Sequence, residues 1–210
     1  MHPTQGIPAA PADPRHVLVH TIERLKADGF HPVMAVELEF YLLDQQRDVN
    51  GRPQPALQTN GERPHAPQVY GIYELEQLQP FLDDLYAACA LQGLPVRTAI
   101  SEYAPGQVEL TLEHRFDALQ AIDEGVRYKR LVKGVANQHG LQACFMAKPF
   151  SDQAGSGMHL HVSLANEHGH NLYASDDPQG TPLLGMPASG TDRMRILPRG
   201  LDFPPYTLLF

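Results

Sequence analysis

Glutamate side chains at alternating positions are the first feature of this sequence that could do chemistry. Glu37 and Glu39 lie two apart within residues 33–43, where apolar residues alternate with them, so an extended strand would place both carboxylates on one face. At an effective dielectric constant of about 20, two carboxylates roughly 7 Å apart repel each other by about 2 kcal/mol. A divalent cation between them would reverse the sign of that energy. Taken alone, the pair also suits a half-exposed strand that simply faces water.

Histidines occupy one face of a second predicted strand. Residues 155–164 have the sequence GSGMHLHVSL, in which alternation places His159, His161 and Ser163 on one face and apolar residues on the other. A lone histidine is more often a surface residue, but two on one strand face favour a binding role. The glycines before them allow backbone groups to approach a ligand closely.

A third segment adds two more carboxylates. Glu102 and Glu109 lie on either side of Pro105 and Gly106, which are typical of a turn that would fold both toward one site. Four glutamates and a histidine suit Mg²⁺ or Mn²⁺, because hard cations prefer oxygen ligands. No cysteine stands near enough in the sequence to favour structural zinc.

Composition limits the class of protein. The chain has 210 residues, 42% of them apolar, and a net charge of -8, which favours one main domain and a solvated acidic surface. Without a run of lysine or arginine the chain is not expected to bind nucleic acid. No signal peptide and no apolar run of membrane-spanning length is recognisable, so we expect a cytoplasmic protein in which Cys89 and Cys144 are buried thiols.

The elements that must position these residues follow from periodicity, caps and turn signals. Strands and helices do not alternate regularly, which favours an α+β domain: a mostly antiparallel sheet with flanking helices. We expect residues 1–12 to be a loose leader, residues 13–184 to form the domain and residues 185–210, rich in proline and glycine, to be an atypical tail. The predicted helices are 13–29, 80–92 and 117–139, the predicted strands are 33–43, 96–102, 108–113, 143–146 and 158–164, and 45–70 is predicted to be a long loop.

Three motifs in order resemble the glutamine synthetase family. They are AVELEFYL at 35–42, PGQVE at 105–109 and GSGMHLH at 155–161, supported by FMAKP at 145–149, and the resemblance covers about residues 13–184. It implies part of the family's catalytic domain and ATP-dependent joining of ammonia or an alkyl amine to the γ-carboxylate of glutamate, through γ-glutamyl phosphate. It also implies a ring-shaped homo-oligomer.

The resemblance also implies roles for individual residues. The candidate ligands would form two sets. The first set would hold a metal ion that orders the glutamate site, and the second would hold a metal ion on the ATP phosphates. Gly155 and Glu102 would lie at the bound glutamate, while His161 and Ser163 would line the nucleotide pocket. The first set of ligands is Glu39, Glu102 and Glu109, and the second is Glu37 and His159.

Two departures from the family pattern leave alternatives open. Ala154 stands where members that make glutamine usually have asparagine, which suggests the branch resembling γ-glutamylpolyamine synthetases and leaves ammonia and an alkyl amine both open. The register is lost after residue 184, which suggests a frameshifted tail, and a preceding β-grasp domain and later arginines of the family are not found. We therefore expect little ligase activity from this chain alone; a non-catalytic metal-binding remnant or partner of intact subunits is the alternative.

Two further readings are disfavoured. A cupin-like metal oxygenase would also use a His-x-His strand, but the carboxylate-rich ligand set and the other two motifs argue against it. A plain structural domain would need all three motifs to occur in order by accident.

Overall fold

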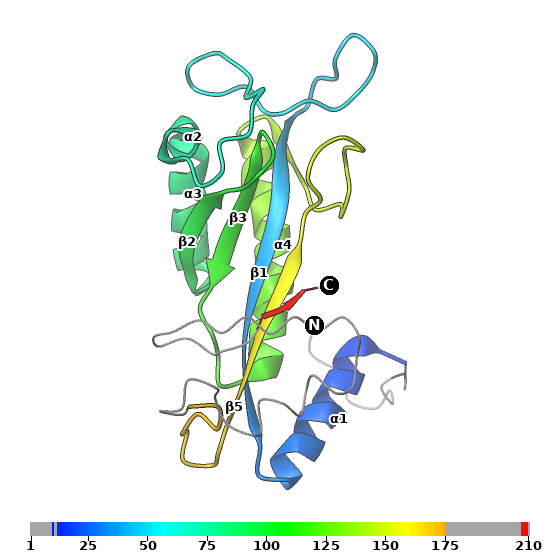
Figure 1. The fold of residues 1–210 in the computed structure, drawn as a ribbon, viewed down its shortest axis with the longest axis vertical. Coiled ribbons are helices and arrows are strands. Elements are labelled where there is room, and N and C mark those ends of the chain that lie inside the picture. The colour runs from blue at the N-terminus through cyan, green and yellow to red at the C-terminus, as the bar shows by residue number, and fades with distance from the viewer. Residues whose placement is uncertain (1–9, 11, 175–206, 210) are drawn as a thin grey trace.

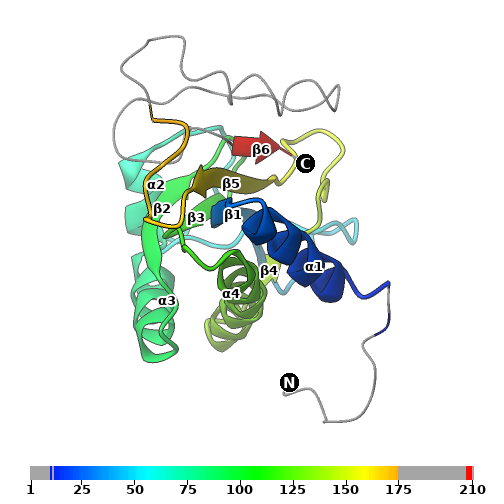
Figure 2. The same cartoon turned by 90° about the horizontal axis from the view of Figure 1, so that it is seen from below.

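The computed structural model describes residue 10, residues 12–174 and residues 207–209. In this part of the chain a single sheet carries helices on one of its faces (Figures 1 and 2). The elements are α1 (Pro14–Ala27), β1 (His31–Asp44), α2 (Ile72–Gln77), α3 (Gln79–Leu91), β2 (Val96–Ser101), β3 (Gln107–Leu112), α4 (Ala118–Gln138), β4 (Leu141–Cys144), β5 (Met158–Ala165) and β6 (Thr207–Leu209).

The long strand β1 is the centre of the sheet. All described pairings are antiparallel, in the order β2-β3-β1-β5-β6, with β4 also paired to β1. One edge of β1 pairs with β3 through residues 37–41, while the other edge is shared by β5 along 31–38 and by β4 along 41–44. The predicted α+β class with a mostly antiparallel sheet is therefore confirmed.

The helices begin and end at the residues that the sequence marks. Asp13 caps α1 by accepting a hydrogen bond from the Arg15 backbone N–H at 2.9 Å, and Pro14 occupies the first turn. Asp117 caps α4 by accepting from the backbone N–H groups of the second and third helical residues. Gly140, with φ of 70°, follows the end of α4, a left-handed conformation that glycine adopts without steric strain.

The two faces of β1 have different surroundings. The apolar side chains face α3 and α4, and the fully buried Phe40 and Leu42 pack there with Tyr128 and Val132 of α4. The opposite face carries the glutamates, as alternation predicts. That face is not wholly open to water, because Tyr41 is buried beneath the segment after β4 and donates a hydrogen bond to the Ala154 carbonyl oxygen at 2.6 Å.

Three details differ from the expectations. The strand β4 begins at residue 141 rather than 143, where its first residue pairs with Asp44. The short helix α2 was not predicted, because its six residues include no buried one and so form no apolar stripe. Within the tail, residues 207–209 pair with β5 as strand β6; the remaining tail and the predicted leader lie outside the described residues, except residues 10 and 12.

Two other sequence-based expectations concern cysteines and membranes. Cys89 is buried and free, and burial raises the pKa of its thiol to about 11, while Cys144 is free and partly buried. Among the described helices, none combines the length and apolar character needed to cross a bilayer.

Candidate metal centre

Strand register brings the candidate ligands into one cross-section of the sheet. Glu39 of β1 lies directly opposite Glu109 of β3, and Glu37 lies directly opposite His159 of β5. Glu102 follows the end of β2, where its backbone N–H donates to the Gln107 carbonyl oxygen at 2.9 Å. Side chains from three neighbouring strands and one turn therefore converge on one face of the sheet. Figure 2 shows helices α1, α3 and α4 on the other face.

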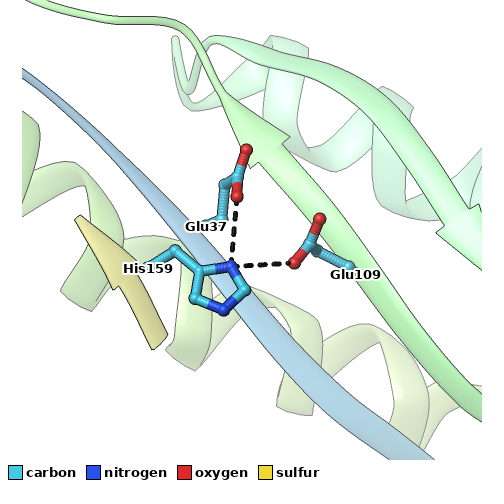
Figure 3. A group of neighbouring side chains, drawn as sticks. All are labelled: Glu37, Glu109 and His159. Atoms are coloured by element: carbon cyan, nitrogen blue, oxygen red, sulfur yellow. Dashed lines mark hydrogen bonds and ion pairs between the residues drawn. The ribbon is translucent and has the colours of Figure 1, made fainter. Parts of the chain in front are cut away.

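The imidazole of His159 lies at the centre of this cluster. Its Nδ1 is 3.2 Å from Glu37 Oε2 and 3.5 Å from Glu109 Oε2. Dashed lines mark these two interactions in Figure 3. Its Nε2 is 3.8 Å from Glu39 Oε1. His161, two residues along β5, places its Nε2 2.9 Å from Glu37 Oε1.

Two groups of possible ligand atoms share a single residue. Glu37, Glu109 and His159 form one group, and Glu39, Glu102 and Glu109 form the other, with the ligand atoms of each group within 4.8 Å of one another. The structure thus brings together all five predicted ligands, in nearly the two sets that the family resemblance implies. Glu109 joins both groups, and metal binding by these residues stays a prediction.

Burial and mutual repulsion change the acidity of the carboxyl groups. Burial, followed by the charges of Glu109 and Glu39, raises the pKa of Glu102 to about 7. Burial and the Glu109 charge also raise the pKa of Glu39. Both carboxyl groups therefore hold protons more tightly than free glutamate, because burial and the neighbouring negative charges disfavour the ionised form.

The neighbouring imidazoles lower the pKa of Glu37 instead of raising it. Burial acts to raise the pKa of Glu37, but hydrogen bonds from His159 and His161 outweigh it and lower this pKa to about 2. Hydrogen bonds to Glu109 and Glu37 raise the pKa of His159 to about 10. In the described parts of the chain only histidines form ion pairs with the clustered glutamates, so neither lysine nor arginine neutralises them.

A glycine keeps the space within the cluster open. A Cβ atom added at Gly157 would lie 2.7 Å from His159 Nε2 and 3.0 Å from Glu39 Oε1, so a side chain there would fill the gap between two candidate ligands. The ligand set is rich in carboxylate oxygen and includes one imidazole, which suits Mg²⁺ or Mn²⁺. The residues present therefore fit a divalent cation.

Of the remaining predicted site residues, His161 contacts the cluster through Glu37, while Gly155 lies beside it and Ser163 lies farther along β5. The Gly155 carbonyl oxygen accepts a hydrogen bond from Gln107 Nε2 at 3.0 Å, which places this glycine beside the glutamates. Ser163 is buried near the other end of the β1–β5 pairing, opposite Val33, and donates to Asn171 Oδ1 at 3.1 Å. The predicted roles of Gly155, His161 and Ser163 in binding glutamate and nucleotide stay predictions.

Gln107 also lies at the cluster, although it was not among the predicted site residues. This residue is 2% exposed, and its Nε2 donates to Glu39 Oε2 at 2.8 Å. It lies two residues before Glu109 on β3, so strand alternation alone would have placed both side chains on the same face. The alternation of side chains along the strand was therefore the sequence feature that could have identified Gln107.

An antiparallel sheet, backed by helices on one face and carrying a carboxylate-rich cluster on the other, defines an α+β domain with a candidate metal centre. Comparisons with known proteins identify its family. Residues 11–186 match the family model described as the glutamine synthetase catalytic domain, and the chain belongs to the glutamine synthetase family.

Relatives in this family are named after different products. The chain is 41% identical to gamma-glutamylputrescine synthetase PuuA of Escherichia coli (strain K12), over 82% of this chain and 37% of that protein. It is 31% identical to a glutamine synthetase of Thermotoga maritima, over 80% of this chain and 36% of that protein. The chain therefore spans little more than a third of the length of these curated relatives.

A solved structure shares the fold. The structure of a GmaS complex with ADP aligns with a TM-score of 0.69 and 28% identity, covering 80% of this chain and 37% of that one. The sequence relatives and the structural neighbour thus lead to the same family.

Proposed function

We propose that this chain forms the metal-binding part of an ATP-dependent ligase that joins an amine to the γ-carboxylate of glutamate. The observation that carries the proposal is the convergence of Glu37, Glu39, Glu102, Glu109 and His159 in one cluster that lysine and arginine do not neutralise in the described chain. Family membership supports the reaction class, since the relatives are named as ligases of this type.

The two overlapping groups suit two cations side by side. Bound Mg²⁺ or Mn²⁺ would spread the charge of the phosphoryl group that moves from ATP to the glutamate γ-carboxylate. Glu109 belongs to both groups and would fix their separation. His161 would hold Glu37 in place through the contact at 2.9 Å, leaving the other Glu37 oxygen toward His159. These residues would orient the site, and the bound cations would supply the positive charge.

The favoured acceptor is an alkyl amine. Identity to the gamma-glutamylputrescine synthetase, at 41%, exceeds identity to the Thermotoga glutamine synthetase, at 31%. Ala154 also replaces the asparagine usual in members that make glutamine. Its carbonyl oxygen accepts the Tyr41 hydrogen bond at 2.6 Å, which holds this turn against the sheet. Ammonia remains the second candidate, because several matched relatives are named glutamine synthetases.

Metal binding and turnover need separate measurements. Isothermal titration of the chain with Mn²⁺ tests the centre, and a coupled assay of ADP release with glutamate, ATP and Mg²⁺ tests the reaction. The assay uses putrescine, isopropylamine or ammonia as acceptor, with glutamate omitted as control. ADP release that depends on glutamate and is fastest with putrescine would support the full proposal.

The other outcomes separate the alternatives. Mn²⁺ binding without ADP release for any amine would favour a metal-binding role, alone or beside intact subunits, over catalysis by this chain. Fastest turnover with ammonia would assign glutamine synthesis instead. Absence of Mn²⁺ binding would refute the proposed centre.

A further inference from the structure

A buried amide joins three parts of the candidate centre. Gln107 begins β3, and both of its side-chain polar atoms are engaged although the residue is only 2% exposed. Its Nε2 donates to Glu39 Oε2 at 2.8 Å and to the Gly155 carbonyl oxygen at 3.0 Å. Its Oε1 accepts from the Ala104 backbone N–H at 3.2 Å. The amide thus connects a candidate ligand with the glycine turn before His159 and with the turn after Glu102.

The two oxygens of Glu39 have different partners. Oε2 accepts hydrogen bonds from Gln107 and from the Gly157 backbone N–H, the latter at 2.9 Å. Two donors occupy the two lone-pair directions of that oxygen. Oε1 instead lies 3.8 Å from His159 Nε2, on the side of the gap that Gly157 keeps open. Of the two Glu39 oxygens, Oε1 is therefore the one that faces the gap between the candidate ligands.

We propose that Gln107 is a positioning residue that holds Glu39 for one-oxygen coordination through Oε1, an inference that rests on the metal centre proposed above. A second oxygen from the same carboxylate would suit Ca²⁺, which accepts bidentate carboxylates, whereas Mg²⁺ demands a near-octahedral arrangement. By fixing Oε2, Gln107 favours the smaller cation.

The residue type follows from the charge of the site. A lysine or arginine at position 107 would donate the same hydrogen bond but would neutralise Glu39 and compete with the cation. A glutamate would lack the donors and add another negative charge to a cluster in which burial already raises the pKa of Glu39 and Glu102. A neutral amide donates without changing the net charge.

A volume-matched substitution tests the positioning role. Gln107→Met keeps the approximate size and removes all three hydrogen bonds. Gln58→Met is the matched control, because Gln58 is also buried and donates to a carboxylate, that of Glu74 on α2, outside the centre. Substitution of a residue that orients a metal ligand typically lowers metal affinity by about 10- to 100-fold.

The primary measurement is Mn²⁺ and Ca²⁺ affinity by isothermal titration. We expect Gln107→Met to weaken Mn²⁺ binding about 10- to 100-fold and to lower the ratio of Mn²⁺ to Ca²⁺ affinity, while Gln58→Met leaves both unchanged. The loss of a buried hydrogen bond to a carboxylate, which both variants share, would not by itself move the ratio. Unchanged Mn²⁺ affinity and an unchanged ratio in a folded Gln107→Met variant would overturn the proposal.

A second measurement works without metal. Amide hydrogen exchange in the metal-free protein should accelerate at Ala104 and Gly157 in Gln107→Met, and not in Gln58→Met, because those two N–H groups depend on the Gln107 amide and on the Glu39 carboxylate it holds. If the wild-type chain binds no Mn²⁺, the proposed metal centre is refuted. The amide exchange rates still decide whether Gln107 orders the two turns. Unchanged exchange at both amides would refute the positioning role.

Discussion

Two buried glutamates of this molecule have opposite electrostatic surroundings. Glu124 on α4 is 1% exposed, and its carboxylate accepts hydrogen bonds from Arg115 Nε at 2.9 Å and from a terminal Arg115 nitrogen at 3.1 Å. Glu109 on β3 is 5% exposed and has only His159 as an ion-pair partner among the described residues, with Glu39 and Glu102 nearby. One carboxylate is neutralised by the chain itself, and the other lies among further carboxylates.

This difference distinguishes a structural carboxylate from a candidate ligand. Burying a charge is unfavourable unless a partner compensates it, so a fold retains such a group when the partner is present. Arg115 is that partner for Glu124, and it is held there because its backbone pairs with Met34 of the central strand β1. The Glu109 cluster lacks an equivalent arginine in the described chain, and a bound cation would supply the missing charge.

Removing the arginine should have the largest effect on stability. Arg115→Met would leave Glu124 buried with only the weaker contacts of Gln120 and Arg127, so we expect the free energy of unfolding to fall by about 3 kcal/mol. Urea denaturation at pH 7 measures it. Arg15→Met is the control, because it breaks the exposed pair with Asp123 and should cost much less. Equal losses in the two variants would contradict the comparison.

Removing the shared carboxylate should instead weaken metal binding. Glu109→Gln takes one oxygen ligand from both groups, and we expect Mn²⁺ affinity to fall by about 100-fold, equivalent to about 2.7 kcal/mol. The metal-free variant should lose much less stability than Arg115→Met, since the loss of the charged His159 contact is offset by the removal of one repelling charge. Isothermal titration and urea denaturation measure the two quantities. Loss of stability comparable to that of Arg115→Met would mean that Glu109 is structural.

Protons should compete with the cation. With a pKa of about 10, His159 is protonated at pH 7, and with a pKa of about 7, Glu102 is half protonated. A cation that binds these groups must therefore displace protons. Mn²⁺ affinity should therefore rise between pH 6 and pH 8, by about tenfold per pH unit where one proton is released. Titrations at three pH values measure the slope. A slope of zero would exclude His159 and Glu102 as ligands.

Neutralising Glu102 should give the smallest effect, an increase in stability without metal. Its raised pKa means that between about pH 4.5 and pH 7 the folded protein binds more protons than the unfolded chain, so stability falls as pH rises through this window. Glu102→Gln removes that penalty and should add about 1 kcal/mol at pH 8, after screening by solvent, and little at pH 4. Urea denaturation at both pH values tests this, and Glu113→Gln, at an exposed pair, is the control.

Most elements could be predicted from local signals. Asp13, Gly29, Asp117 and Gly140 mark helix ends through caps and a left-handed conformation, and the period of two in β1 marks its faces. Such signals act over a few residues, so they survive without knowledge of the fold. The short helix α2 was missed because it contains no buried residue and so has no apolar stripe. The start of β4 was missed because pairing with the distant strand β1, rather than a local pattern, defines it.

The sequence by itself determined the fold class, the family resemblance and the five candidate ligands, because alternation and motif spacing are local properties of the chain. Only the tertiary structure decided that Glu109 belongs to both ligand groups, that Ser163 lies apart, and that Gln107 holds Glu39. Strand register sets these relations: Glu39 meets Glu109, and Glu37 meets His159, through hydrogen bonds between segments far apart in sequence. A shift of one residue in either pairing would have turned those side chains to opposite faces.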